Sequence, residues 1–355
     1  MIPLAKPIFT DEMKEAAIHA LQNERFVLGE SVQKFEEEFA KYSGTKYAVS
    51  VNSGTAALQL SLIALGINNG EKVITSPNSF VASANSIIYA GGKPEFADIE
   101  TDTGNINIKK INPDGIRGII PVHIYGQPCD MKRIMEIAEE NNLIVVEDAC
   151  QAHGAEFKGK KAGSIGDIGC FSFYSSKNMT VCGDGGMVIT DNEEVAKKLK
   201  SLRDCGRKSK YEHSMLGFTF RLNTVNAAIG RVQLKHLDRW NSKRRDAAKI
   251  YRQLLPKELL LSEKDDTVPV FHMFVIKTKN RNKLIEFLNS NGIGNGIHYP
   301  IPIHLQPIYI ELFGYKKNDF PDAEKFSEQV LSLPIFPEIK KDEIKFICEK
   351  IVEVL

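Results

Sequence analysis

Between residues 46 and 200, short apolar runs alternate with longer segments whose apolar residues recur at helical spacing. Short runs of this kind are typical of strands, and the longer segments are typical of helices that bury one face. The expected strands are Lys46–Asn52, Lys72–Ser76, Pro94–Ile99, Gly118–Ile124, Leu143–Glu147, Gly169–Ser175 and Gly186–Thr190. The expected helices are Ala56–Leu65, Ser79–Tyr89 and Asp130–Asn141. This alternation predicts an α/β fold with a largely parallel sheet between helices, and such a sheet binds ligands outside the carboxyl ends of its strands.

The chain after residue 223 has a different pattern, which indicates a second, smaller domain. A long, charge-rich stretch, Thr224–Leu255, has helical character and would link the two parts. The elements expected beyond it are Val270–Thr278, Arg281–Asn289, Gly296–Tyr299, Asp322–Leu331 and Lys341–Val354. We therefore predict an amino-terminal arm and a large domain over residues 1–240, and a small carboxyl-terminal α+β domain over residues 241–355.

Composition removes several classes of function. The 46 basic and 45 acidic residues leave a net charge of +1, so bulk charge favours neither a nucleic-acid nor a membrane partner. Basic residues on the long helix resemble a nucleic-acid stripe, but a solvated helix face explains them more simply. The sequence shows no secretion signal, no apolar run of roughly 18 residues and no CxxC pair among its six cysteines. We expect a cytoplasmic protein with free thiols and no metal site.

The junction Ser53-Gly54-Thr55, between a predicted strand and a predicted helix, has the chemistry of a phosphate site. Ser53 is a favoured helix cap, and Gly54 lets the backbone approach a ligand. The amino end of a helix carries free N–H donors and a partial positive charge, both of which attract a phosphate group. A plain capped helix start would show the same residues.

Asp148 follows the most apolar of the predicted strands, Leu143–Glu147. Burying a carboxylate there is costly unless it meets a cation. A pyridinium nitrogen is such a cation, and the carboxylate would keep it protonated so that the ring withdraws electrons. A neighbouring arginine or a loop amide is the alternative partner.

Lys177 lies in a loop just after the predicted strand Gly169–Ser175. A partly desolvated lysine near a cationic ring has a lowered pKa and forms Schiff bases with aldehydes. Ser172 carries a hydroxyl suited to phosphate, and Phe80, just past another strand end, could stack on a flat ring. Taken singly, a surface lysine and a core phenylalanine are the plainer interpretations.

At one end of a parallel sheet, these features combine into a phosphate cradle, a stacking ring, a pyridinium partner and a Schiff-base lysine. The combination is far more specific than any part. It predicts pyridoxal 5′-phosphate (PLP) as the cofactor, with Lys177 and Asp148 as the catalytic residues.

Motifs that carry a family resemblance run along nearly the whole chain. They are Phe26–Gly29, Ser53–Leu58, Glu147–Gly154, Phe171–Phe173, Lys177-Asn178, Gly183–Gly186, His298–Pro300 and Ser332–Pro334. Through them the chain resembles the fold-type-I sugar aminotransferases of the DegT/DnrJ/StrS type. The resemblance implies transfer of an amino group, usually from L-glutamate, to a keto-sugar attached to a nucleotide. It also implies a homodimer whose two active sites are completed across the interface.

The resemblance assigns a role to each residue near the cofactor ring. Lys177 would carry PLP and then act as the base that moves a proton. Asp148 would pair with the pyridine nitrogen, Gln151 would lie by the ring hydroxyl, and Phe80 would stack on the ring.

Family members hold the cofactor phosphate at positions that here are Gly54, Thr55 and Ser172. The family usually has an asparagine that reaches the phosphate of the neighbouring subunit, and this chain has Thr219 there. Threonine still offers a hydroxyl but is shorter, so the contact across the interface is in question. Arg221, two residues later, remains a candidate ligand for a substrate carboxylate or for the interface.

Two histidines, His298 and His304, lie in a proline-rich segment that could border the sugar pocket; structural loop histidines are the alternative. Three other functions compete with transamination. Relatives with histidine at the Schiff-base position remove a sugar hydroxyl, but this chain has Lys177. A non-catalytic sensor or regulator could keep the fold, and a dinucleotide-dependent oxidoreductase would need GxGxxG where this chain has Asn52–Thr55.

Overall fold

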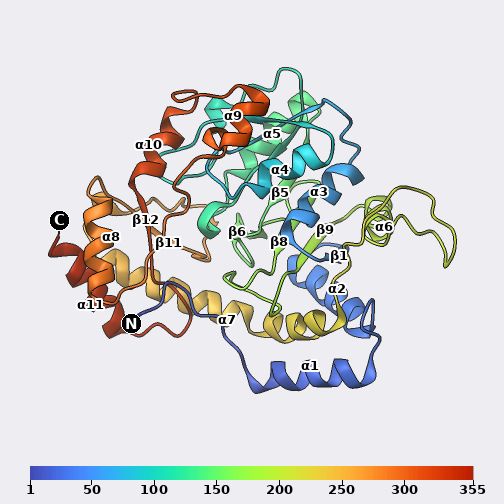
Figure 1. Cartoon of the computed structure of the whole chain (residues 1–355), viewed down its shortest axis with the longest axis horizontal. Helices are drawn as coiled ribbons and strands as arrows, with labels where there is room; N and C mark the ends of the chain where they lie inside the picture. Colours follow the sequence, from blue (N-terminus) through green and yellow to red (C-terminus); the bar gives the residue numbers. More distant parts are fainter. Residues whose placement is uncertain (355) are drawn as a thin grey trace.

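A computed structural model describes residues 1–354 and shows one large sheet with helices packed on both of its faces (Figure 1). The strands are β1 (Tyr47–Val51), β2 (Lys72–Thr75), β3 (Lys93–Phe96), β4 (Ile116–Ile120), β5 (Ile144–Asp148), β6 (Glu156–Phe157), β7 (Lys160–Lys161), β8 (Ile168–Ser172), β9 (Gly186–Thr190), β10 (Thr267–Val268), β11 (Phe274–Lys277) and β12 (Val330–Leu333). The α-helices are α1 (Asp11–Asn23), α2 (Glu30–Ser43), α3 (Gly54–Ala64), α4 (Ala82–Tyr89), α5 (Met131–Asn141), α6 (Glu193–Leu202), α7 (Thr224–Leu254), α8 (Arg281–Ser290), α9 (Pro307–Phe313), α10 (Pro321–Gln329) and α11 (Lys341–Val352). Short 3-10 helices are η1 (Ile108–Lys110), η2 (Ile124–Gly126), η3 (Lys257–Leu259) and η4 (Ile303–Leu305).

The large sheet has the strand order β1-β9-β8-β5-β4-β2-β3. Only β9 runs against its neighbours, pairing antiparallel with β1 and with β8; the other pairs are parallel. All seven strands of this sheet were expected from the sequence, within a few residues of their bounds. The prediction of a mixed α/β fold with a mostly parallel sheet is therefore confirmed.

Side chains that alternate along the strands build two separate apolar layers. On one face Val145 packs with α5, while α2 and α7 cover Phe171 and Met187 further along. On the other face Val146 and Val188 pack against α3 and α6. This alternation follows from the two-residue period of a strand, and it explains why these strands are apolar almost throughout.

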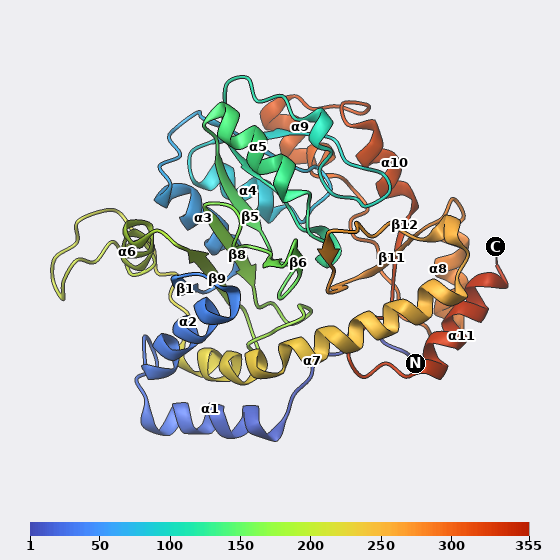
Figure 2. The same ribbon diagram turned by 180° about the vertical axis from the view of Figure 1, so that it is seen from behind.

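Helix α7 is 31 residues long and passes from the large sheet to a second, two-stranded sheet (Figures 1 and 2). Its first half packs on α1 and α2, and its second half packs on α11. The predicted division at residues 240 and 241 falls inside this helix and stays a prediction. Arg244 does not lie on a solvated face: it is 4% exposed and donates to the main-chain oxygens of Phe271 and Ile335.

Around the second sheet, two predictions need correction. Gly296–Tyr299 forms no strand, because only Gly296 makes a bridge, with Ser332. The predicted helix Asp322–Leu331 ends at Gln329, and Val330–Leu333 forms β12 instead, since its buried side chains pair with β11.

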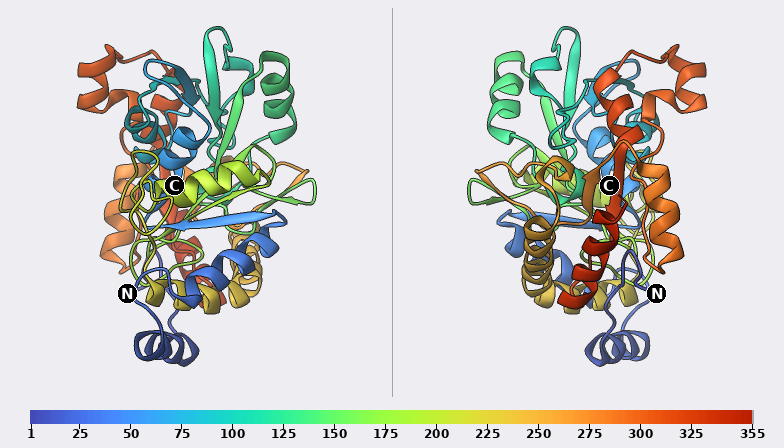
Figure 3. Two further views of the ribbon diagram at one scale, coloured as in Figure 1. Left: turned by 90° about the vertical axis from the view of Figure 1, so that its right-hand side faces the viewer. Right: turned by 90° about the vertical axis from the view of Figure 1, so that its left-hand side faces the viewer.

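The amino-terminal arm begins beside the small sheet, where Ile2 N–H donates to Gly292 O at 2.8 Å. It then continues into α1, which projects from the body on the side of α7 (Figure 3). None of the helices formed within residues 1–354 combines the length and apolar character needed to cross a membrane.

Candidate active site

The carboxyl ends of four strands meet at one edge of the large sheet, and each leads to a residue singled out from the sequence. β1 leads into Ser53 and α3, and β2 leads into the turn that contains Phe80. β5 ends at Asp148 and β8 ends at Ser172, with Lys177 in the loop that follows. The parallel strands bring these residues together because their carboxyl ends lie on the same side of the sheet.

Gly54 marks the closest approach of three of these segments. A β-carbon on Gly54 would lie 2.7 Å from Cβ of Ser172 and 2.9 Å from Sγ of Cys150. Ser53 caps α3 by accepting a main-chain hydrogen bond of 3.1 Å. The N–H groups of Gly54 and Thr55 precede the hydrogen bonds within the helix. The amino end of α3 and the hydroxyl of Ser172 therefore lie side by side, and Gly54 allows their backbones to approach closely. This arrangement fits a phosphate group.

Asp148 is a buried carboxylate, only 5% exposed. It accepts a hydrogen bond of 2.7 Å from Ser83 Oγ and one of 3.2 Å from the main-chain N–H of Cys150. A loop amide thus does bind it, as one alternative interpretation held, but no ion pair to Asp148 forms within residues 1–354. Because a buried carboxylate without a cation is costly, the site fits a cationic ring nitrogen.

Lys177 is half-buried beside Asp148 and Cys150. Burial lowers the pKa of Lys177, and Cys150 and Asp148 oppose this lowering by smaller amounts. The neutral amine is the form that attacks a carbonyl carbon and accepts a proton. The structure therefore brings Lys177 and Asp148 together, and the catalytic role of Lys177 stays a prediction.

Three histidines have pKa values that burial lowers, with a further lowering from the charge of Lys177. Burial lowers the pKa of His153 to about 3, with a further lowering from the charge of Lys177. Burial and the same lysine also lower the pKa of His272 and of His298. At neutral pH these rings add no positive charge that would compete with a cationic ring for Asp148.

Gln151 is buried and held between two tyrosines. Its side-chain oxygen accepts a hydrogen bond of 2.8 Å from the main-chain N–H of Tyr125, and its nitrogen lies 3.4 Å from the hydroxyl of Tyr299. The Tyr299 ring is 6.1 Å from the ring of Phe80, centre to centre. Phe80 is 55% exposed, which leaves its ring free to cover a flat ligand.

Thr219 lies on an exposed segment, not beside Lys177. Its hydroxyl oxygen is 3.4 Å from Sγ of Cys205. The next residue, Phe220, accepts a hydrogen bond of 2.9 Å from Asn52 N–H, so the segment passes the phosphate cradle of its own chain. A bond from Thr219 to the phosphate of a second subunit stays a prediction.

The three candidate substrate residues differ in their environments. Arg221 forms an ion pair with Asp204 at 2.5 Å, and His298 Nδ1 lies 2.8 Å from the hydroxyl of Ser332. His304 is fully buried, and its Nε2 lies 3.2 Å from Glu324. This burial favours the structural interpretation of His304, whereas His298, near Lys177, keeps its predicted substrate role.

Several residues of the site are not predicted from the sequence, among them Ser83, Tyr125, Cys150 and Tyr299. Cys150 and Tyr299 lie inside the motifs Glu147–Gly154 and His298–Pro300, next to predicted site residues. Ser83 lies in the first turn of α4, three residues after Phe80, so the helix after the predicted stacking residue was the signal that could have found it. Tyr125 gave no signal, because its contacts join segments far apart in the sequence.

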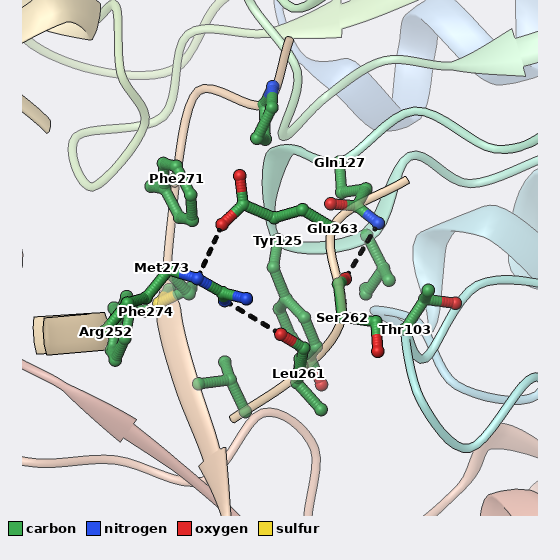
Figure 4. A pocket seen from close by; sticks show the side chains of 13 residues that line it. Thr103, Tyr125, Gln127, Arg252, Leu261, Ser262, Glu263, Phe271, Met273 and Phe274 are labelled. Atoms are coloured by element: carbon green, nitrogen blue, oxygen red, sulfur yellow. Dashed lines mark hydrogen bonds and ion pairs between the residues drawn. The ribbon is translucent and has the colours of Figure 1, made fainter. Parts of the chain in front are cut away.

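A separate small pocket lies between the large sheet and the β11 region (Figure 4). Apolar side chains such as Met273 and Phe274 line it, together with the ion pair of Arg252 and Glu263 at 2.9 Å. None of the predicted site residues lines this pocket; Tyr125 does, as a neighbour of Gln151.

Residues 7–352 match the sequence model of the DegT/DnrJ/EryC1/StrS aminotransferase family. The chain belongs to this family. It is 40% identical to the "Pleiotropic regulatory protein" of Geobacillus stearothermophilus, covering 96% of this chain and 94% of that one. It is 38% identical to the dTDP-3-amino-3,4,6-trideoxy-alpha-D-glucose transaminase of Streptomyces venezuelae, covering 96% and 92%. The PLP form of Spr1654 from Streptococcus pneumoniae superposes with a TM-score of 0.93 at 25% identity, over 100% and 99% of the two chains.

Membership of this aminotransferase family confirms the predicted fold class, the enzyme class and PLP as the cofactor. The residues present fit PLP on three observations. A glycine cradle adjoins a serine hydroxyl, a buried carboxylate has no ion-pair partner among residues 1–354, and a lysine of lowered pKa lies beside it. The assignment of individual residues to PLP remains a prediction.

Replacing Gly54 by alanine is expected to weaken PLP binding about tenfold. The added methyl group would overlap Ser172 and Cys150, and overpacking of this size costs roughly 1–3 kcal/mol, where 1.4 kcal/mol is tenfold in affinity. Titration of the apo-protein with PLP, followed by absorbance, measures the change. Thr55→Ser keeps the hydroxyl and serves as the matched change, with affinity within about twofold of wild type. Equal affinity of Gly54→Ala and wild type would remove Gly54 from the phosphate site.

Proposed function

We propose that this sugar aminotransferase moves the amino group of L-glutamate to a nucleotide-linked keto-sugar, yielding an amino sugar and 2-oxoglutarate. The observation that carries the proposal is the pair formed by Lys177 and Asp148. Within residues 1–354, a half-buried lysine of lowered pKa faces a buried carboxylate that has no ion-pair partner. The transaminase named for the Streptomyces venezuelae relative supports a nucleotide-linked sugar as the acceptor.

Different residues of the site would hold the phosphate, the ring hydroxyl and the ring face of PLP. The amino end of α3, with Gly54 and Thr55, and the hydroxyl of Ser172 would hold the phosphate. Gln151 would donate to the ring hydroxyl, and Phe80 would cover the ring face. In this arrangement Gly54, Thr55 and Ser172 would hold one end of the cofactor, and Lys177 would hold the other.

When bound, PLP supplies an electron-poor ring that stabilises negative charge on the carbon next to the transferred nitrogen. Asp148 would keep the ring nitrogen protonated, and Ser83 would hold the carboxylate in place through its 2.7 Å hydrogen bond. Lys177 Nζ, once displaced by the donor amine, would take the proton from the donor α-carbon and return it on the other side of the nitrogen. The buried site favours the neutral amine that this task needs.

We further propose a homodimer, with Thr219 directed to the partner's phosphate site. Support comes from large apolar side chains that are exposed around the segment containing Thr219: Leu216 is 94% and Tyr211 83% exposed. Phe26, at 66%, lies in a segment that bridges to the same region through Val27 and Asn223. Exposed apolar surface of this kind is typical of subunit interfaces. A cytoplasmic location belongs to the same proposal.

The spectrum of the PLP-loaded protein tests the reaction. L-glutamate alone should convert the visible absorbance of the bound cofactor to that of its amine form, with release of one 2-oxoglutarate per site. A suitable nucleotide keto-sugar should restore the original absorbance, because the two halves of a ping-pong reaction share one site.

Other outcomes of the same experiment favour other functions. Loss of a sugar hydroxyl without gain of an amine would favour a dehydratase. The relative named a pleiotropic regulatory protein makes regulation the second candidate. PLP absorbance that responds to no amino donor, L-glutamate included, would favour that role and contradict the proposed transamination.

A further inference from the structure

Tyr125, in η2, joins two parts of the candidate active site that come from distant segments. Its main-chain N–H donates to Oε1 of Gln151 at 2.8 Å, and its hydroxyl donates to the main-chain oxygen of His298. The residue has a φ of +58° and is 6% exposed, with Ile99, Val275 and Phe326 in the apolar cluster around it. Tyr125 is therefore held firmly on both its backbone and its ring.

The hydrogen bond to Tyr125 decides which end of the Gln151 amide faces the site. A main-chain N–H can only donate, so the side-chain atom that meets it must be the oxygen. The amide nitrogen then faces the opposite way, toward the hydroxyl of Tyr299 at 3.4 Å. Its second N–H remains available for an acceptor in the site.

The contacts form a closed circuit. Tyr125 binds Gln151, Gln151 approaches Tyr299, and Tyr299 directly follows His298, whose main-chain oxygen accepts from Tyr125. Tyr299 also places its ring beside Phe80. Tyr125 therefore fixes both the amide of Gln151 and, through His298, the ring of Tyr299.

We propose that Tyr125 is a positioning residue for the PLP site, which orients the amide of Gln151 through its N–H and the ring of Tyr299 through its hydroxyl. This proposal rests on the proposed function, because it takes Gln151 to face the cofactor ring hydroxyl. It assigns Tyr125 a role through its neighbours, and no contact of its own with PLP or substrate.

The charge state of both hydroxyls suits this circuit. Burial raises the pKa of Tyr125 above its usual range, against a smaller lowering by the side chain of Asn78. Burial, with the nearby charge of Asp148, raises the pKa of Tyr299 in the same direction. Both tyrosines therefore keep their protons at neutral pH, and Tyr125 remains a donor to His298.

Titrating apo-protein with PLP tests the proposal without relying on turnover. Tyr125→Phe keeps the N–H to Gln151 but frees the His298–Tyr299 segment, so PLP should bind about 5- to 10-fold more weakly, the effect of one lost hydrogen bond. Tyr299→Phe should weaken binding by a similar factor. The double variant should bind no more weakly than the weaker single variant, because both changes break the same circuit.

Gln151→Glu tests the orientation of the amide. Its carboxylate keeps an acceptor for Tyr125 but replaces the donor that faces Tyr299 and the ring hydroxyl. PLP should bind at least about tenfold more weakly, and the visible absorbance of the bound cofactor should titrate at a shifted pH. If Tyr125→Phe failed to fold, the same comparison can be made with Gln151→Glu, Tyr299→Phe and their double variant. The loss of PLP affinity in the double variant should then be smaller than the product of the two single losses.

Tyr89→Phe, at an exposed tyrosine on α4, is the matched control and should bind PLP within about twofold of wild type. Two results would overturn the inference: a Tyr125→Phe protein with wild-type PLP affinity, or factors for Tyr125 and Tyr299 that multiply in the double variant. A purely structural role would lower the melting temperature and leave PLP affinity unchanged. If the wild-type protein binds PLP without a covalent link to Lys177, the proposed function is wrong. In that case the PLP affinities of the Tyr125 and Tyr299 variants should not depend on each other.

Discussion

Lys177→Ala should abolish transamination, with kcat lower by about 10⁴-fold or more. The change removes both the amine that carries the cofactor and the base that moves the proton, and general-base catalysis alone contributes typically ~10²- to 10⁴-fold. The variant should still bind PLP noncovalently through the phosphate cradle, but without the visible band of a lysine-bound cofactor. Absorbance spectra measure the loss of the visible band, and fixed-time assays with L-glutamate measure the loss of turnover.

Two further variants separate chemistry from charge. Lys177→Arg places a permanent positive charge at this position but cannot form the covalent link, because the guanidinium stays protonated, so it should be as inactive as Lys177→Ala. Lys160→Ala, at an exposed lysine in β7, should keep wild-type activity and spectrum. An unchanged spectrum in Lys177→Ala would refute the assignment of this lysine.

Asp148→Asn should lower kcat by about 10²- to 10³-fold while leaving the fold intact. The amide oxygen can still accept the hydrogen bond from the N–H of Cys150 at the place of Oδ1, and the amide nitrogen at the place of Oδ2 can donate to the hydroxyl of Ser83, so the local geometry has a substitute. What is lost is the negative charge that stabilises a protonated ring nitrogen, and removal of one preorganised electrostatic group typically costs a factor of this size. Single-turnover kinetics with L-glutamate report the loss in the proton-transfer step.

The neighbour of Asp148 supplies the comparison. Ser83→Ala removes one hydroxyl donor to the carboxylate but leaves the carboxylate charged, so its effect should be roughly tenfold, smaller than that of Asp148→Asn. If Ser83→Ala were as damaging as Asp148→Asn, the carboxylate would act through geometry and not through charge. Wild-type rates in Asp148→Asn would exclude the carboxylate as the partner of the ring nitrogen.

The sequence revealed most of the large sheet because strands buried on both faces are almost uniformly apolar and end at turn residues. Asp148 was identifiable for the same reason, because a carboxylate at the end of such a strand is unusual enough to need a chemical explanation. Lys177 was identifiable only in combination with the other strand-end residues, because a lone loop lysine is usually a surface charge. Ser53 and Gly54 were found from helix-capping chemistry, and the structure retains that cap.

The residues that the sequence did not reveal depend on tertiary contacts. Tyr125 meets Gln151 across 26 residues, and Gln151 meets Tyr299 across 148. Pattern and spacing carry no information on such pairs. The same holds for β12, whose residues look helical in isolation but find a strand partner in β11.

The continuous helix α7 also determines how the molecule can be divided. Its first half covers the large sheet with Ala227, Leu234 and Leu237, and its second half fills the small core with Ala248 and Tyr251. A chain cut near residue 240 would break this helix between the turns that cover the two cores, and it would also separate the small core from Ile2 of the amino-terminal arm. Separate expression of the two halves is therefore a poor route to stable fragments, and experiments on either half should use the intact polypeptide.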